Sequence, residues 1–274
     1  MGRHLICAPY DDGRLDWRMG AGARLIASEA GPAAEAIDDV DPDRPPIGRA
    51  FDLAARLSAH VREARERGDH PVVLAGNCNS ALGTASGLDG RVGVVWFDAH
   101  ADFDTPDDNE SGFFDVMGLS ILTGTGWRAL RETIPSFRPV REEDVVLAAV
   151  RDLEPYQRER LERSAITVVP GRVEAGPFEA AVGALAGRVD SVYLHIDLDA
   201  VDPSDGRANQ YAAPGGPPAA DLLARVELVR ERLPVGATAL TAYDPEADPE
   251  RRVLALALEL LRPPPPPEAP SASA

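Results

Sequence analysis

The sequence predicts an α/β fold, a three-layer α/β/α sandwich built around a mostly parallel sheet. Short runs of Val, Ile and Leu alternate along the chain with longer segments of helical spacing, and this alternation is typical of a sheet covered by helices on both faces. Hydrophobic residues make up 44% of the chain but aromatic residues only 5%, so the core must be mostly aliphatic. An aliphatic core suits a buried parallel sheet.

The predicted strands are the short apolar runs 5–8, 72–75, 92–97, 145–150, 166–169, 192–196 and 237–242. The predicted helices have charged outer faces and span 50–67, 178–186, 218–232 and 249–261. We expect residues 1–262 to form a single domain. The segment 31–46, rich in Pro, Asp and Ala, is predicted to be a surface loop. The proline-rich segment 263–274 can neither continue a helix nor bury apolar surface, so it is predicted to be disordered.

The charge balance excludes two classes of partner. The formal net charge is −17, from 45 acidic and 28 basic residues, whereas nucleic acids and anionic membranes require a basic surface. No run reaches the ~20 apolar residues of a membrane helix, and the amino terminus lacks the pattern of a signal peptide. Cys7 and Cys78 are too few to staple a chain of 274 residues, so a reducing compartment is expected. These observations predict a cytoplasmic enzyme.

Acidic residues directly follow two of the predicted strands. Asp98, His100 and Asp102 come after the strand 92–97, and Asp197 and Asp199 come after the strand 192–196. Ligands bind at the carboxyl ends of the strands in open α/β sheets, and side chains spaced by two point to the same side of extended backbone. A single aspartate there would be read as a turn or cap residue, but that does not explain five such residues. Four carboxylates and an imidazole predict a site for two divalent cations, with manganese suited to this ligand set.

These two stretches carry a resemblance to a known family. Phe-Asp-Ala-His-Ala-Asp at 97–102 and His-Ile-Asp-Leu-Asp-Ala-Val-Asp-Pro at 195–203 resemble the two aspartate-rich motifs of the arginase (ureohydrolase) superfamily. The resemblance implies a three-layer α/β fold, assembly as a trimer or hexamer, and a hydroxide that bridges two Mn²⁺ ions. It implies cleavage of a C–N bond in a small linear amidine or guanidino compound.

The resemblance also assigns roles to the acidic residues. Asp98 and Asp197 correspond to ligands shared by both ions, and Asp102 to a ligand of the first ion. His100 and Asp199 correspond to ligands of the second. Asp102 is further expected to orient the hydroxide by hydrogen bonding.

The chain departs from the family pattern at three places. The family has a histidine ligand of the first ion in the motif Gly-Gly-Asp-His-Ser; here residues 76–80 read Gly-Asn-Cys-Asn-Ser, so Asn79 is predicted to replace it, with Cys78 as the alternative. The loop motif Ser-Gly-x-x-His becomes 111–115, which makes Ser111 a candidate substrate contact and Asp115 a candidate proton donor. The family glutamate that binds guanidinium falls on Ala242, so Asp244 is the candidate for a cationic substrate, with a turn residue as the alternative.

Two other functions remain open on the sequence. The first is a mononuclear amidohydrolase that resembles the metal-dependent deacetylases and uses only Asp98, His100, Asp197 and Asp199. The second is a metal-binding relative without catalytic activity, which the altered positions would allow. The substrate itself is not identified by the sequence.

Overall fold

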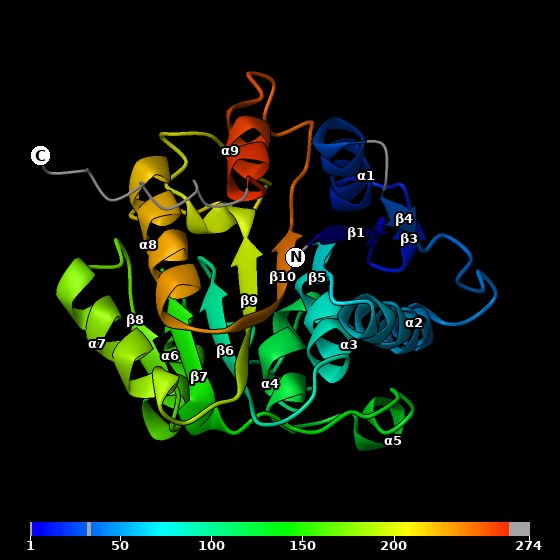
Figure 1. The fold of residues 1–274 in the computed structure, drawn as a ribbon, viewed down its shortest axis with the longest axis horizontal. Coiled ribbons are helices and arrows are strands. Elements are labelled where there is room, and N and C mark those ends of the chain that lie inside the picture. The colour runs from blue at the N-terminus through cyan, green and yellow to red at the C-terminus, as the bar shows by residue number, and fades with distance from the viewer. Residues whose placement is uncertain (1, 32–33, 263–274) are drawn as a thin grey trace, which may run out of the picture.

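A computed structural model describes residues 2–31 and 34–262 of the chain, and its centre is an eight-stranded sheet. The strand order is β4-β1-β5-β10-β9-β6-β7-β8, and every neighbouring pair is parallel (Figure 1). The strands are β1 (Arg3–Ala8), β4 (Glu35–Ala36), β5 (His70–Ala75), β6 (Val92–Phe97), β7 (Val145–Ala148), β8 (Thr167–Val169), β9 (Ser191–Asp197) and β10 (Val235–Thr241). A separate antiparallel pair is formed by β2 (Tyr10–Asp11) and β3 (Arg14–Leu15).

Helices cover both faces of the sheet, which confirms the predicted three-layer α/β/α sandwich. One face packs on α1 (Met19–Ala30), α7 (Ala175–Ala186), α8 (Ala219–Arg232) and α9 (Arg252–Leu260). The other packs on α2 (Pro46–Glu66), α3 (Ala81–Ser86), α4 (Gly118–Leu122), α5 (Arg128–Arg131) and α6 (Pro155–Arg163). Alternate residues of one strand enter the two apolar cores: Val94 and Trp96 of β6 lie in one, Val95 and Phe97 in the other.

The predicted elements agree with this architecture, and the structure adds others: the strands β2, β3 and β4 and the helices α1, α3, α4, α5 and α6. Each of the predicted strands overlaps a strand of the sheet, and the predicted helices overlap α2, α7, α8 and α9. Among the added elements, β4 lies within the predicted surface loop 31–46 and pairs Glu35 with Ile6 of β1. Two residues are too few to show a period-two pattern. The single domain over 1–262 stays a prediction, and the predicted disordered segment 263–274 lies outside the described residues.

The central strands place their carboxyl ends together. Phe97 of β6 pairs with Ile196 of β9, and Asp197 of β9 pairs with Thr241 of β10. In parallel sheets the crevice at this edge is where ligands bind. Within the described ranges, no helix is both long and apolar enough to cross a bilayer.

Candidate metal centre

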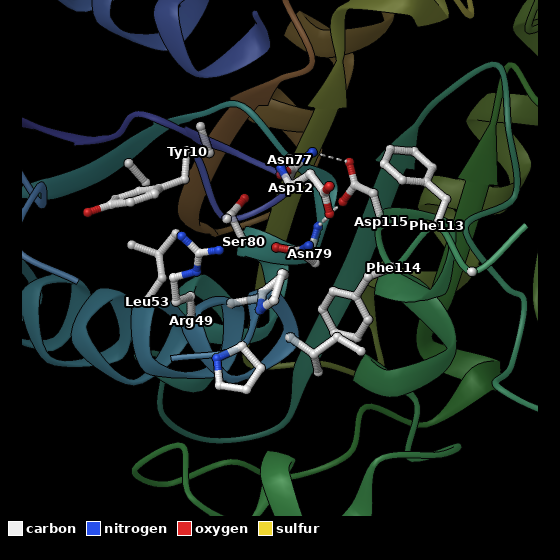
Figure 2. Close-up of a pocket in the computed structure, with 18 residues that line it drawn as sticks. Tyr10, Asp12, Arg49, Leu53, Asn77, Asn79, Ser80, Phe113, Phe114 and Asp115 are labelled. Atoms are coloured by element: carbon white, nitrogen blue, oxygen red, sulfur yellow. Dashed lines mark hydrogen bonds between the residues drawn. The ribbon is translucent and has the colours of Figure 1, made fainter. Parts of the chain in front are cut away.

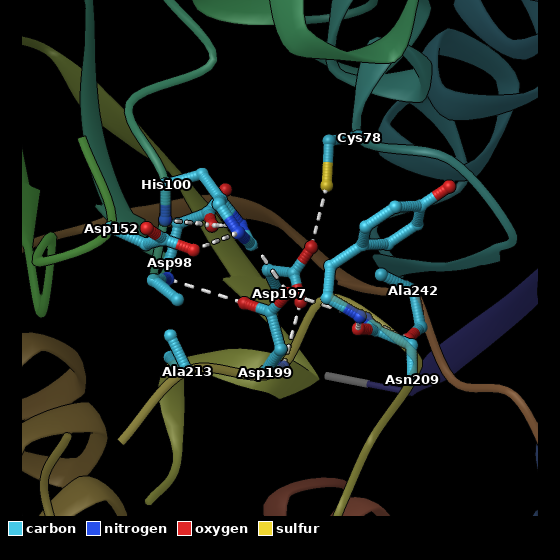
Figure 3. A network of polar contacts seen from close by, with 12 residues as sticks. Cys78, Asp98, His100, Asp152, Asp197, Asp199, Asn209, Ala213 and Ala242 are labelled. Atoms are coloured by element: carbon cyan, nitrogen blue, oxygen red, sulfur yellow. Dashed lines mark hydrogen bonds and ion pairs between the residues drawn. The ribbon is translucent and has the colours of Figure 1, made fainter. Parts of the chain in front are cut away.

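Acidic side chains meet at the ends of β6 and β9 (Figure 3). Because Phe97 is level with Ile196, Asp98 lies beside Asp197, the last residue of β9. The 3₁₀ helix η4 (Leu198–Ala200) follows at once and turns Asp199 back, so that its backbone N–H donates to Asp197 Oδ1 at 2.7 Å. Asp98, Asp197 and Asp199 are buried, each at most 4% exposed. Three carboxylates are thus brought together below the surface, as the sequence predicts.

His100 faces two of these carboxylates. Its Nδ1 lies 3.3 Å from Asp98 Oδ1 and 3.4 Å from Asp199 Oδ2. Burial lowers the pKa of His100, but the carboxylates of Asp199 and Asp98 outweigh burial and raise that pKa to about 9. Ligand atoms of Asp98, His100 and Asp199 all lie within 4.8 Å of one another. These three residues could therefore hold one metal ion.

Asp102 joins the group from the segment after β6. Its φ is 47°, in the left-handed region that residues other than glycine rarely adopt, and its side chain is buried. Burial raises the pKa of Asp102 well above its ordinary value, and the neighbouring carboxylates of Asp98 and Asp115 add to the shift. Burial and nearby carboxylates raise the pKa of Asp98 and Asp197 in the same direction. We call Asp98, His100, Asp102, Asp197 and Asp199 the acid cluster.

The turn after β5 brings Cys78, rather than Asn79, to the acid cluster. Residue 78 begins the 3₁₀ helix η1 (Cys78–Ser80), and Cys78 Sγ donates to Asp197 Oδ2 at 2.9 Å. Asn79 faces a neighbouring cavity of about 310 Å³, and its backbone N–H donates to Asp115 Oδ1 at 2.8 Å (Figure 2). Successive side chains of a 3₁₀ helix point ~120° apart, so Cys78 and its neighbour Asn79 do not both face the acid cluster. Its position therefore favours Cys78 over Asn79 as a ligand.

The loop 111–115 forms a wall of the site. Ser111 lies at the exposed rim, where its Oγ donates to Asn109 Oδ1 at 2.9 Å. Asp115 is buried at the start of the 3₁₀ helix η2 (Asp115–Met117) and accepts from Asn77 Nδ2 at 2.8 Å as well as from Asn79. Burial raises the pKa of Asp115 to about 7, although these hydrogen bonds act in the opposite direction. A carboxyl group in this setting can hold and release a proton near neutral pH.

Asp244 does not line the site. The strand β10 ends at Thr241, and Ala242 adopts a φ of 63°, so the alternation of the strand does not continue to residue 244. Asp244 Oδ2 lies 3.7 Å from Arg18 Nε, and its Oδ1 accepts from the backbone N–H of Glu246 at 3.0 Å. This position favours the turn interpretation over the substrate-binding role predicted for Asp244.

Three side chains that the sequence analysis did not single out support the acid cluster. Trp96 Nε1 donates to Asp98 Oδ2 at 2.9 Å, and Asn209 Nδ2 donates to Asp199 Oδ2 at 3.2 Å. The half-buried guanidinium of Arg151 donates to the backbone carbonyl of Asp199 at 2.9 Å. Trp96 precedes Asp98 by two residues on one strand face, a spacing that could have identified it. Asn209 and Arg151 come from segments with no comparable local signal.

A cavity of about 440 Å³ opens over the acid cluster. Its floor includes His100, Asp102, Asp197 and Asp199, and Cys78 and Asp115 reach it from the sides. The rings of Phe113 and Tyr211 stack with their centroids 5.7 Å apart. The less polar part of the wall consists of Met19, Phe113, Val116, Tyr211 and Ala242. A cavity of this size, with an acidic floor and an apolar wall, suits a small polar molecule.

Comparisons with known sequences give a consistent picture. The model of the arginase family matches residues 18–263. An arginase of Bacillus caldovelox is 29% identical over 215 residues, which cover 75% of this chain and 72% of that protein. An arginase of Staphylococcus aureus (strain MRSA252) is 32% identical over 162 residues, or 56% of this chain, and the chain matches 53% of its length.

Comparisons with solved structures give the same fold. The arginase of Bacillus caldovelox superposes with a TM-score of 0.82 at 24% identity, covering 94% of this chain and 96% of that one. The formimidoylglutamase of Bacillus subtilis superposes with a TM-score of 0.74 at 16% identity, covering 94% of this chain and 85% of that one. At these identities the likeness concerns the fold.

Proposed function

The chain belongs to the arginase family, and from this premise we propose that it is a manganese-dependent hydrolase that cleaves a C–N bond of a linear amidine or guanidino compound. Family membership makes the chain a hydrolase of C–N bonds other than peptide bonds. The observation that carries the proposal is the placement of Asp98. Its carboxylate belongs to two groups of possible ligands, one with His100 and Asp199 and one with Cys78 and His195. A carboxylate shared in this way is typical of the bridging ligand in a two-metal site.

The chemistry of the acid cluster fits two divalent cations. Oxygen ligands and one imidazole match the preferences of manganese. Asp98, Asp102, Asp197 and Asp199 bring four negative charges to a buried place, and two divalent cations bring the same number of positive charges. Burial is the main cause of the raised pKa of Asp102 and Asp197, and bound cations would remove the repulsion between carboxylates that adds to it.

The residues around the cavity would have different roles in the reaction. The two ions, when bound, supply a water that is activated as a nucleophile near neutral pH. Asp102 lines the cavity floor, where a carboxylate oxygen can accept a hydrogen bond from that nucleophile and orient it. Asp115 lines the side of the same cavity and can give a proton to the departing amine.

The cavity would select the substrate by size and by its rim. Ala242 leaves an apolar surface at the end of β10, and Asp244 does not line the cavity, so the amidine group would face the ions without an acidic partner from this segment. Ser111 at the rim can donate to a polar substituent of the substrate. We further propose a cytoplasmic homo-oligomer, a trimer or hexamer, which sedimentation of the purified protein would test.

Incubation of Mn²⁺-loaded protein with guanidino, hydroxyguanidino, formimino and acetamido compounds tests the activity. We expect turnover of an amidine or guanidino compound and two bound ions per chain. The turnover rate should fall by more than ~100-fold in Asp98→Ala, because losing a ligand to the ions costs more than the ~10- to 100-fold effect of losing an outer contact. Asp89→Asn is the control, since this carboxylate is 80% exposed. One bound ion with activity on an amide would instead indicate the mononuclear amidohydrolase. Two ions without turnover would indicate a non-catalytic relative.

A further inference from the structure

A buried histidine lies directly beneath the acid cluster. His195 precedes Asp197 by two residues on β9 and is fully buried. Its ring stacks on Trp96 with centroids 3.6 Å apart, and its Nδ1 lies 2.6 Å from the hydroxyl of Tyr193. A neutral imidazole carries one lone pair that can bind a metal ion. With the ring proton on Nδ1, donated to the Tyr193 hydroxyl, the lone pair is on Nε2, which lies 3.3 Å from the Thr241 hydroxyl oxygen.

The thiol of Cys78 and the ring of His195 approach the same point. The hydroxyl oxygen of Thr241 lies 3.2 Å from Cys78 Sγ and 3.3 Å from His195 Nε2, so one small group separates them. Ligand atoms of Cys78, Asp98 and His195 all lie within 4.8 Å of one another. Cys78 also donates to Asp197 Oδ2, which places a second carboxylate at the same point. A thiol, an imidazole and two carboxylates therefore converge there.

We propose that Cys78, His195, Asp98 and Asp197 form one half of the binuclear centre, and that this half binds Zn²⁺ in preference to Mn²⁺. The proposal rests on the proposed function, because Asp98 also serves the other half with His100 and Asp199. Thiolate and imidazole ligands suit Zn²⁺, whereas the half without sulfur suits Mn²⁺. The centre would then hold two different ions.

The geometry requires only small movements. Zinc binds sulfur at ~2.3 Å and nitrogen or oxygen at ~2.0 to 2.2 Å, so the ligand atoms of a tetrahedral ion lie about 3.5 Å apart. The three ligand atoms already lie within 4.8 Å, and the Cys78 Sγ to Asp197 Oδ2 contact is 2.9 Å. Rotation of the Cys78 thiol away from Asp197, and of the Thr241 hydroxyl out from between Cys78 and His195, would open the space for the ion. The His195 ring needs no new orientation, because a hydrogen bond on the nitrogen that does not bind metal is the usual arrangement.

Cobalt(II) provides the test, because a thiolate ligand gives bound Co²⁺ an intense near-ultraviolet charge-transfer band. Metal-free protein is titrated with Co²⁺, and then with Zn²⁺. We expect a band that saturates at one Co²⁺ per chain and is bleached by one equivalent of Zn²⁺. The band should be absent in Cys78→Ser and kept in Cys7→Ser, where the other buried cysteine, in β1, is changed. His195→Gln should weaken binding of this Co²⁺ by at least ~10-fold.

The outcomes separate this proposal from the proposed function. If wild-type protein binds two Co²⁺ ions without a thiolate band, the Cys78 and His195 half is overturned while the binuclear hydrolase stands. If elemental analysis finds no metal bound at all, the proposed function fails as well. A band that survives Cys78→Ser, or that excess Zn²⁺ does not bleach, also overturns the proposal. The wild-type measurement needs no variant to fold.

Discussion

The two ends of the parallel sheet bury aspartates in opposite settings. At the amino end, Asp144 precedes β7 and is 1% exposed, and Arg91 donates to both of its oxygens at 2.8 and 2.9 Å. At the carboxyl end, Asp98 is equally buried, but the acid cluster brings four carboxylates together with one imidazole. A buried charge that another protein group neutralises has a structural role. An excess of buried negative charge indicates a site for a bound cation.

Arg151 reduces this contrast only in part, although its charge acts on Asp199, Asp98 and Asp197. It lies beneath the acid cluster, but its guanidinium donates to backbone carbonyls, among them those of Ala149, Asp199 and Ala213. It therefore fixes the positions of the strand ends without forming an ion pair with a carboxylate of the cluster. Arg151 and a protonated His100 offset only part of the four carboxylate charges, and bound cations would offset the rest, as the proposed function requires.

Of the changes at the two ends of the sheet, the largest effect is expected at Asp115, on the carboxyl side. Asp115→Asn keeps the shape of the side chain but cannot carry the proton, so kcat should fall by ~100-fold or more. Metal content should stay at the wild-type value, which separates proton transfer from metal binding. Exposed Asp107→Asn, in the same segment, is the control. Steady-state rates would show this, and an unchanged kcat would remove Asp115 from the mechanism.

A smaller effect is expected where the sheet supports the acid cluster. Trp96→Phe removes the N–H that Asp98 Oδ2 accepts at 2.9 Å, and the loss of such a contact weakens metal binding by ~10-fold or more. The matched control is Trp127→Phe, because the buried Nε1 of Trp127 has no hydrogen-bond partner among the described residues. Calorimetric titration with Mn²⁺ measures both variants. Equal affinities in the two variants would mean that Trp96 does not position Asp98.

At the carboxyl end, the sequence predicts the position of the acid cluster but not the direction of every side chain near it. The runs of β-branched residues identify the strands, and an aspartate pair after each of two strands identifies the acid cluster, because period-two patterns are local. The sequence does not predict whether Cys78 or Asn79 faces the acid cluster. Both lie in the 3₁₀ helix η1, where the period-two pattern of a strand does not apply. The predicted role of Asp244 requires β10 to continue, and the left-handed φ of Ala242 ends the strand before residue 244.

At the amino end, the corresponding change should affect stability alone. Asp144→Asn removes the negative charge that pairs with Arg91, so the melting temperature should fall by a few degrees. Metal affinity and kcat should not change, because Asp144 lies at the opposite end of the strands from Asp98. Thermal unfolding together with Mn²⁺ titration tests this. A loss of metal binding in this variant would break the proposed division between a structural and a functional end.

The smallest effect is expected at His70, the first residue of β5, whose Nε2 lies 3.0 Å from Thr238 Oγ1. Burial and the nearby Arg230, Arg65 and Arg3 lower the pKa of His70 from 6.5 to about 4. Between these values the unfolded chain binds a proton that the folded chain does not, so stability is lost as the pH falls from about 6.5 toward 4.

His70→Gln removes this acid sensitivity, because an amide can keep the contact with Thr238 but does not titrate. Relative to wild type, the variant should gain about 1 kcal/mol between pH 7 and pH 5, a figure reduced for the partial exposure of His70. His195 remains in both proteins, so its own response to acid cancels in the difference. Urea unfolding at the two pH values measures the gain. If the difference in unfolding free energy between variant and wild type does not depend on pH, His70 is protonated as readily in the folded chain as in the unfolded one. The amino end would then tolerate a positive charge at His70, contrary to our expectation.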